Sequence, residues 1–258
     1  MLEGKTVVVT GVGPGLGGEV ARLALRDGAN VMIAARRGDK LEAIAKELDP
    51  SGEHVACQAT DITDPDSCVA LAEAALKRFG RIDALVQVAA YDAVFGSFDE
   101  VKPEDWRQTY EVNVIGTTQM ARAVVPAMRE QGGGAIVLIG SQSSMLRLTP
   151  QIAYGSSKGA LNTAMYHMAA ELGADHIRVN TVIPTWMWGP PVQGYVKMMA
   201  KQRGVSEEEI KAEIVAPMAI KEIPADEDVA EAVVFFCSDR SRMVTGQSLL
   251  VNCGEVMP

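Results

Sequence analysis

Tyr154 and Lys158 stand four residues apart, in a stretch that follows the apolar run of residues 135–139. On a helix this spacing places both side chains on one face, one turn apart. An ammonium group beside a phenol favours the phenolate and so lowers the phenol pKa from its ordinary value of about 10. Such a tyrosine can exchange a proton with an alcohol or a carbonyl near neutral pH. Ser141, at the end of the preceding strand, can hydrogen-bond the same substrate oxygen.

The same pair has a plainer interpretation, because a tyrosine and a lysine at this spacing are usually a partly buried ring beside a solvated charge. The start of the chain favours the interpretation in which Tyr154 and Lys158 take part in catalysis. Residues 6–9 predict a buried strand that runs into a loop with glycines at positions 11, 13, 15 and 17, and a helical pattern follows. Glycines here allow a tight turn and let a pyrophosphate approach backbone N–H groups at the helix N-terminus. A glycine pair alone would more often be a simple turn.

The second predicted strand, residues 30–35, ends beside two arginines. In a dinucleotide-binding fold an acidic side chain here binds the ribose 2′-hydroxyl, whereas an arginine suits a 2′-phosphate. Because Ala35 is followed by Arg36, the sequence favours NADP(H) as the cofactor and leaves NAD(H) possible. The alternative is that Arg36 and Arg37 are solvated charges at a strand end.

Strands and helices alternate along the chain. Further strands are predicted at 54–59, 84–88, 135–139, 177–183 and 248–251, and helices at about 39–48, 65–79, 101–129, 154–173 and 226–238. Asn113 lies inside the long helix, where asparagine is disfavoured because its amide competes for backbone groups; it is otherwise a packing or exposed residue. The pattern predicts one α/β domain over residues 1–258. This domain is a Rossmann-like, doubly wound parallel sheet of about seven strands with helices on both faces.

Residues 185–224 interrupt this alternation with bulky apolar residues and prolines. They follow the carboxyl end of a strand, which is where open α/β sheets bind ligands. We therefore expect a substrate lid at about 185–224, with Trp186, Trp188 and Met198 lining a pocket for an apolar, cyclic or aromatic substrate. Alternatively, these side chains only pack the lid against the domain or a second subunit. A capping box at Ser206 predicts a helix within the segment.

The composition narrows the choice of partners and compartment. The net charge of −9 argues against nucleic acid or an anionic membrane as the main partner. Four scattered cysteines without a C-x-x-C pattern indicate reduced thiols, and three distant histidines give no zinc motif, so no metal is expected. No apolar run approaches the ~18 residues of a membrane span, and the first residues lack a signal-peptide core. These features predict a soluble, cytoplasmic protein.

Together the motifs resemble those of the classical short-chain dehydrogenase/reductase family over nearly the whole chain. The pattern Thr10-Gly11-x-x-x-Gly15-x-Gly17 is similar to that family's cofactor loop, and Asp61 to its acidic residue near the adenine. Later signatures of the family match at residues 177–180 and 245–247. The resemblance implies cofactor contacts from Gly11, Gly15, Leu16, Gly17, Arg36, Asp61, Ile62, Ala89, Lys158 and Pro184. It also implies a substrate contact at Ser143 and a homo-oligomer, either a tetramer or a dimer.

The resemblance extends to a catalytic tetrad of Asn113, Ser141, Tyr154 and Lys158. It implies that Tyr154 is the general acid/base and that Ser141 orients the substrate oxygen. Lys158 would bind the nicotinamide ribose and lower the pKa of Tyr154, and Asn113 would hold a water in a proton relay. The implied activity is an oxidoreductase that interconverts a small-molecule secondary alcohol and a ketone, with hydride passing between the substrate and the nicotinamide.

The chain departs from the family pattern in three places. The family's Asn-Asn-Ala-Gly after the fourth strand is Gln-Val-Ala-Ala here, at residues 87–90, and Gly189 replaces a threonine that often contacts the cofactor carboxamide. Pro14 stands where NADP-preferring members often have a second basic residue. One alternative is therefore a cofactor-binding regulatory or scaffold protein with vestigial activity. Another is an epimerase or dehydratase built on the same fold.

Overall fold

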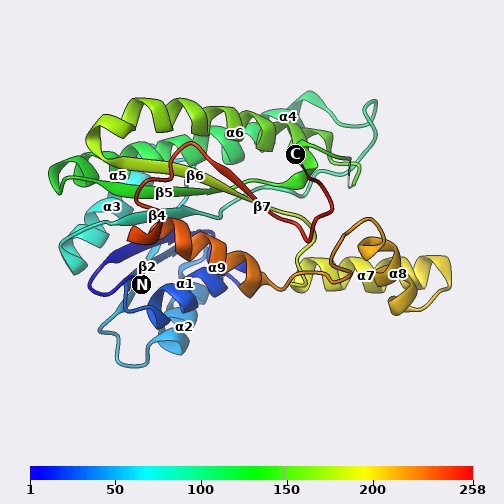
Figure 1. Cartoon of the computed structure of the whole chain (residues 1–258), viewed down its shortest axis with the longest axis horizontal. Helices are drawn as coiled ribbons and strands as arrows, with labels where there is room; N and C mark the ends of the chain where they lie inside the picture. Colours follow the sequence, from blue (N-terminus) through cyan, green and yellow to red (C-terminus); the bar gives the residue numbers. More distant parts are fainter. Residues whose placement is uncertain (148, 258) are drawn as a thin grey trace.

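The computed structural model describes residues 1–147 and 149–257. Within these residues, seven strands form one parallel sheet in the order β3-β2-β1-β4-β5-β6-β7 (Figure 1). The strands are β1 (Thr6–Thr10), β2 (Asn30–Ala35), β3 (Val55–Ala59), β4 (Ala84–Gln87), β5 (Gly134–Ile139), β6 (Ile177–Pro184) and β7 (Ser248–Val251). The predicted Rossmann-like parallel sheet is confirmed, and its order reverses between β1 and β4, which is where such sheets bind ligands.

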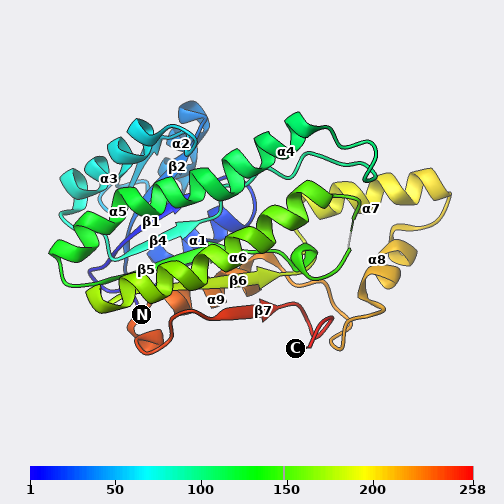
Figure 2. The same cartoon turned by 90° about the horizontal axis from the view of Figure 1, so that it is seen from above.

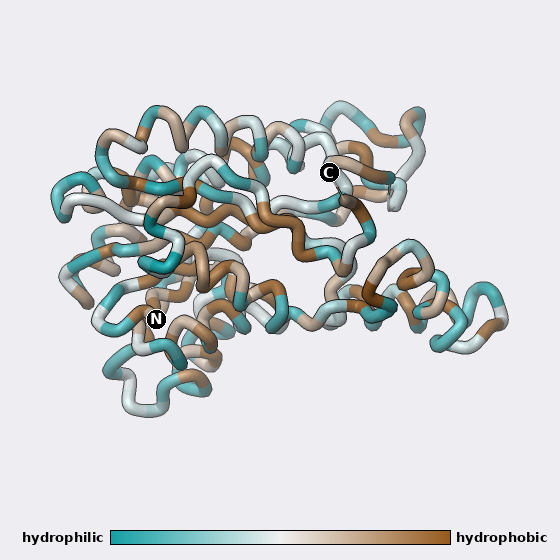
Figure 3. The backbone as a smooth tube through the Cα atoms, in the orientation of Figure 1, coloured by the Kyte–Doolittle hydropathy of each residue, from teal (hydrophilic) through white to brown (hydrophobic). Residues whose placement is uncertain are grey.

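Helices cover both faces of the sheet, as Figures 1 and 2 show. One face carries α1 (Leu16–Arg26), α2 (Gly38–Leu48) and α9 (Asp226–Cys237). The other carries α3 (Pro65–Phe79), α5 (Thr117–Glu130) and α6 (Ile152–Leu172). Each face has its own hydrophobic core, because successive strand residues point to opposite sides: Val7 and Val9 pack toward α1 and α9, and Val8 toward α3 and α5. The strands are accordingly the most continuously hydrophobic part of the chain (Figure 3).

Short sequence signals define several helix ends. Asp64 caps α3 by accepting a hydrogen bond from the N–H of Asp66 at 3.1 Å, and Gly80 ends the same helix in the left-handed conformation. Ser206 and Glu209 form the predicted capping box of α8 (Glu207–Val215). These caps satisfy backbone groups that would otherwise lack partners at the helix ends.

The long helix predicted at 101–129 forms with a change in its middle. It consists of α4 (Pro103–Tyr110), the π-helical segment η1 (Glu111–Gly116) and α5. Asn113 lies in η1, where the wider turn moves its side chain relative to an ordinary α-helical position. Single π turns of this kind often occur at functional sites.

The segment 185–224 forms two helices, α7 (Pro190–Arg203) and α8, which lie beyond the carboxyl ends of the strands (Figure 2). They share a small core of their own around Val196 and Met218. Sequence patterning does not predict α7, although Pro190 occupies a favourable first helical position. None of the helices in the described part of the chain has the length and hydropathy needed to cross a membrane.

Candidate active site

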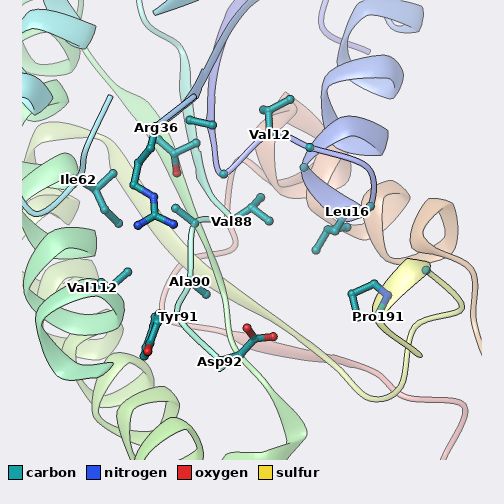
Figure 4. Close-up of a pocket in the computed structure, with 18 of the residues that line it drawn as sticks. Val12, Leu16, Arg36, Ile62, Val88, Ala90, Tyr91, Asp92, Val112 and Pro191 are labelled. Carbon is teal, nitrogen blue, oxygen red and sulfur yellow. The ribbon is translucent and has the colours of Figure 1, made fainter. Parts of the chain in front are cut away.

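A cavity of about 1180 Å³ opens along the carboxyl edge of the sheet (Figure 4). It runs from the end of β2, past the loop after β1, to the segment that joins β6 to α7. Cavities for a single small molecule usually measure about 300–1,000 Å³. This one therefore has room for an extended dinucleotide and a small substrate side by side.

The glycine loop fits a cofactor by its close packing. A Cβ atom at Gly11, whose φ is 75°, would lie 2.3 Å from the backbone nitrogen of Ala89, and one at Gly17 would lie 2.5 Å from the carbonyl oxygen of Gly11. The loop thus touches both the segment after β4 and the first turn of α1. Gly15 and Leu16 lie on the cavity wall, so the N-terminus of α1 meets the cavity. A helix N-terminus approached through glycines is a favourable place for a pyrophosphate.

At one end of the cavity the side chains suit the adenosine half of a dinucleotide. Arg36 lies there between Ile62 and Val88 (Figure 4), and Arg37 and Lys40 also line the cavity. Hydrogen bonds from Thr63, together with the charge of Arg36, lower the pKa of the Asp61 carboxyl. Among the described residues Arg36 forms no ion pair, which leaves its guanidinium available to an anion.

The altered segment after β4 keeps its link to the glycine loop. The Thr10 hydroxyl donates to Oε1 of Gln87 at 2.6 Å, and the N–H of Val88 donates to the Thr10 carbonyl at 3.2 Å. Nε2 of Gln87 is buried without a partner among the described residues. Because Gly11 meets the backbone of Val88 and Ala89 and not their side chains, the change to Gln-Val-Ala-Ala is compatible with the tight loop packing.

Tyr154 belongs to the first turn of α6, and its neighbour Gly155 allows this helix to lie close to η2 (Gln142–Ser144). A Cβ atom at Gly155 would stand 2.6 Å from the carbonyl oxygen of Ser143. This contact brings Tyr154, Ser141 and Ser143 to the same cavity wall. The Ser143 hydroxyl donates to Oγ of Ser141 at 2.8 Å, which orients the Ser141 hydroxyl.

Lys158 and Asn113 lie behind that wall and are both buried. Nζ of Lys158 donates to the carbonyl of Ile139 at 2.7 Å and stands 5.5 Å from the centre of the Tyr154 ring. The Asn113 amide accepts from the N–H of Tyr91 at 2.7 Å, and donates to the Tyr91 carbonyl at 3.0 Å. Its side chain therefore fastens η1 to the segment after β4, whereas its role in a proton relay stays a prediction.

The pKa values of the pair differ from the sequence expectation. Burial, assisted by the charge of Asp92, raises the pKa of Tyr154 to about 12, while a hydrogen bond with Ser141 acts in the opposite direction. Burial also lowers the pKa of Lys158 to about 8. The net shift of the Tyr154 pKa is therefore upward, opposite to the expected lowering, because the loss of water around the phenolate is the largest cause.

The substrate end of the cavity includes only part of the predicted set. Trp186 lines it, together with neighbouring apolar residues of the same segment. Trp188 instead packs in the α7–α8 core with Nζ of Lys211 4.7 Å from its ring centre, and Met198 is 56% exposed on α7. The prediction that Trp188 and Met198 line the pocket is therefore wrong for this structure. Pro184 is buried at the end of β6 and stands behind the wall.

Several polar residues of the cavity are not predicted from the sequence. They are Lys40, Asp92, Gln108, Glu111, Thr149, Gln151 and Asp226. Asp92 lies just past the carboxyl end of β4, so the rule that ligands bind at this edge could have found it. Asp226 is distant in sequence from every motif, and only the packing of α9 beside the glycine loop brings it to the site.

Comparison with known proteins gives one consistent picture. A family model described as Enoyl-(Acyl carrier protein) reductase matches residues 11–255. Dehydrogenase/reductase SDR family member 4 of Mus musculus is 31% identical over 98% of this chain and 88% of the relative. The 7alpha-hydroxysteroid dehydrogenase of Escherichia coli is 31% identical over 99% of this chain and 95% of the relative. D-threitol dehydrogenase of Mycolicibacterium smegmatis is 32% identical over 98% of this chain and 93% of the relative.

Solved structures agree with these relatives. A short-chain type dehydrogenase/reductase from Mycobacterium ulcerans superposes with a TM-score of 0.90 at 30% identity, over 98% of this chain and 90% of that one. A short-chain dehydrogenase/reductase from Burkholderia xenovorans gives a TM-score of 0.88 at 28% identity, over 98% and 97%. The similarity thus includes both the sheet and the segment 185–224.

Proposed function

We propose that this chain, which belongs to the short-chain dehydrogenase/reductase family, is an oxidoreductase that interconverts a secondary alcohol and a ketone with NADP(H). The observation that carries the proposal is the shared cavity. One wall presents Tyr154 and Ser141, and the same cavity contains the glycine loop and Arg36. Proton-transfer groups and a dinucleotide cradle are therefore within reach of one substrate.

Tyr154, Ser141 and Lys158 have separate roles in the proposed reaction. The Tyr154 hydroxyl gives a proton to the carbonyl oxygen in reduction and takes it back in oxidation. Ser141 donates a hydrogen bond to that oxygen and stabilises the charge that develops on it. Lys158 binds the ribose beside the nicotinamide and supplies a positive charge near Tyr154. When bound, the nicotinamide donates or accepts the hydride.

The preference for NADP(H) is supported by the basic end of the cavity. Arg36 reaches into it, and Arg37 and Lys40 add positive charge at the same end. An arginine can bind a 2′-phosphate through two parallel hydrogen bonds, which are stronger than neutral ones. NAD(H) lacks that phosphate and would gain nothing from these three side chains.

The substrate we propose is apolar and cyclic or aromatic. Trp186, Met187 and Val192 supply apolar surface to the cavity that also contains Tyr154, and they belong to the segment 185–224 that we propose as the lid of a single-domain enzyme. Two relatives bear on this choice in opposite ways, since one is named for a hydroxysteroid and the other for D-threitol. A cytoplasmic location and a homo-oligomeric state remain predictions from the sequence.

The test is a pair of variants assayed with a panel of ketones. Tyr154→Phe removes the proton donor and should lose nearly all turnover while binding NADPH with unchanged affinity. Tyr166→Phe, on the exposed side of the same helix, is the matched control and should keep activity. Full activity in Tyr154→Phe would refute the mechanism. Binding of NADPH to the wild-type protein without turnover of any alcohol or ketone would favour the scaffold alternative.

A further inference from the structure

Asp226 occupies an unusual place in the cavity. It is the first residue of α9, it is half-buried, and its carboxylate lies between the glycine loop and the start of α7. A Cβ atom at Gly189 would stand 2.5 Å from Oδ2 of Asp226, and one at Gly15 would stand 3.8 Å from it. The carboxylate thus fills the space where a side chain at position 189 would begin.

The backbone conformation at position 189 does not require a glycine. Its φ of −99° and ψ of 179° lie in the extended region that every residue adopts. The residue is also the N-cap of α7, where Ser, Thr, Asp or Asn would satisfy a free backbone N–H better than glycine. A larger residue at position 189 would therefore require the Asp226 carboxylate to move from its present place.

The carboxylate of Asp226 has no partner among the described residues, although the neighbouring acids do. Glu227 pairs with Arg22 at 2.9 Å, and Asp228 accepts from the N–H of Ala225 at 2.8 Å. Asp226 instead faces the cavity, and its burial and the charge of Glu19 raise its pKa. A half-buried carboxylate in this position calls for a hydrogen-bond donor.

We propose, on the basis of the dinucleotide function above, that Asp226 accepts a hydrogen bond from the carboxamide NH2 of the nicotinamide and so orients the ring toward Tyr154. The cavity order supports this partner. Arg36 marks the adenosine end, whereas Asp226 adjoins both Gly15 of the glycine loop and Gly189 of the segment that leads from β6 into α7. The donors on that half of the cofactor are the ribose hydroxyls and the carboxamide NH2, and only the carboxamide is attached to the ring and so fixes its orientation.

The experiment compares three probes by equilibrium binding, followed by the quenching of tryptophan fluorescence. NADP+ carries the carboxamide, its 3-acetylpyridine analogue replaces the NH2 group by a methyl group, and 2′-phospho-ADP-ribose lacks the ring. The wild-type protein should bind NADP+ about tenfold more tightly than the acetylpyridine analogue, the effect of about one hydrogen bond. In Asp226→Ala this ratio should fall to near one, with no change for 2′-phospho-ADP-ribose.

Two further variants separate position from charge. Glu227→Ala removes a neighbouring acid that faces away from the cavity and should keep the wild-type ratio. Gly189→Thr alone should weaken NADP+ binding because its Cβ meets the Asp226 carboxylate, whereas Gly189→Thr combined with Asp226→Ala has room for the threonine hydroxyl and should restore the ratio. Thermal melts of each variant show whether the fold is kept.

Three results would overturn the proposal. If folded Asp226→Ala keeps the wild-type ratio of affinities for NADP+ and the acetylpyridine analogue, Asp226 does not contact the carboxamide. The proposed dinucleotide function would not be affected by that result. If Asp226→Ala binds all three probes more tightly than the wild-type protein does, and by the same factor, Asp226 acts on the diphosphate by charge repulsion. Failure of the wild-type protein to bind any of the probes would overturn the proposed function and this inference together.

Discussion

Lys158 should destabilise the folded protein at neutral pH, and replacing it should reveal this cost. Burial lowers its pKa from 10.5 to about 8, and a tenfold change in an acid dissociation constant corresponds to about 1.4 kcal/mol. Below pH 8 both the folded and the unfolded chains carry the ammonium, and the folded state bears the full penalty of about 3 kcal/mol. Lys158→Met removes that penalty and loses one charge-assisted hydrogen bond to Ile139 worth about 2 kcal/mol, so it should stabilise the protein by about 1 kcal/mol at pH 7.

The pH dependence gives the sharper test. Between pH 8 and 10.5 the unfolded chain holds the Lys158 proton and the folded chain does not, so wild-type stability should rise by about 1.4 kcal/mol per pH unit from this group. The assay is urea unfolding of wild type and Lys158→Met at pH 7, 8, 9 and 10, because the difference between them cancels most other titrations. The advantage of the variant should shrink steadily above pH 8. A difference that is constant with pH would refute the reasoning, as would a variant less stable than wild type at pH 7.

Other predictions test the remaining parts of the cavity. Arg36→Ser should raise the KM for NADPH by about tenfold to a hundredfold and leave the KM for NADH unchanged; a wild type that already prefers NADH would contradict it. Gly11→Ala should destabilise the fold by more than about 2 kcal/mol, since its Cβ would lie 2.3 Å from backbone at a φ of 75°, whereas Gly13→Ala has open space and should melt like wild type. Trp186→Ala should raise the KM of an apolar ketone, and Trp188→Ala should lower the melting temperature without that rise in KM; the reverse pattern would exchange their roles.

The sequence predicts the fold well because its signals are local and agree with one another. Buried strand patterns, the Asp64 cap and the Ser206 capping box each depend on a few neighbouring residues, and all of them appear in the structure. The helix α7 is not predicted, since Gly189 and the prolines after it suggest a loop when they are read alone. Its stability comes from packing against α8, which no local pattern encodes.

A site residue is predictable from the sequence where the backbone geometry requires that residue type. It is less predictable where the direction of the side chain decides whether the residue reaches the cavity. The close approach of Gly11 to Ala89 follows from the motif. In contrast, Trp186 and Trp188 are two residues apart in the same segment, and only the path of the chain into α7 sends one to the cavity and the other to the lid core. Composition alone assigns both to the pocket.

The distribution of charge along the cavity connects these observations. Arg36 lies at the adenosine end, whereas Asp92 acts on Tyr154 and Asp226 adjoins Gly189, so the sign of the side-chain charges changes along the cavity. A dinucleotide with a 2′-phosphate at one end and a cationic oxidised ring at the other matches this gradient in one orientation only. The same arrangement explains the pKa of Tyr154, since Asp92 adds to the effect of burial and a cationic ring would oppose both. Helical spacing brings Lys158 to Tyr154, but the direction in which the pKa moves depends on the charges and burial that the whole cavity provides.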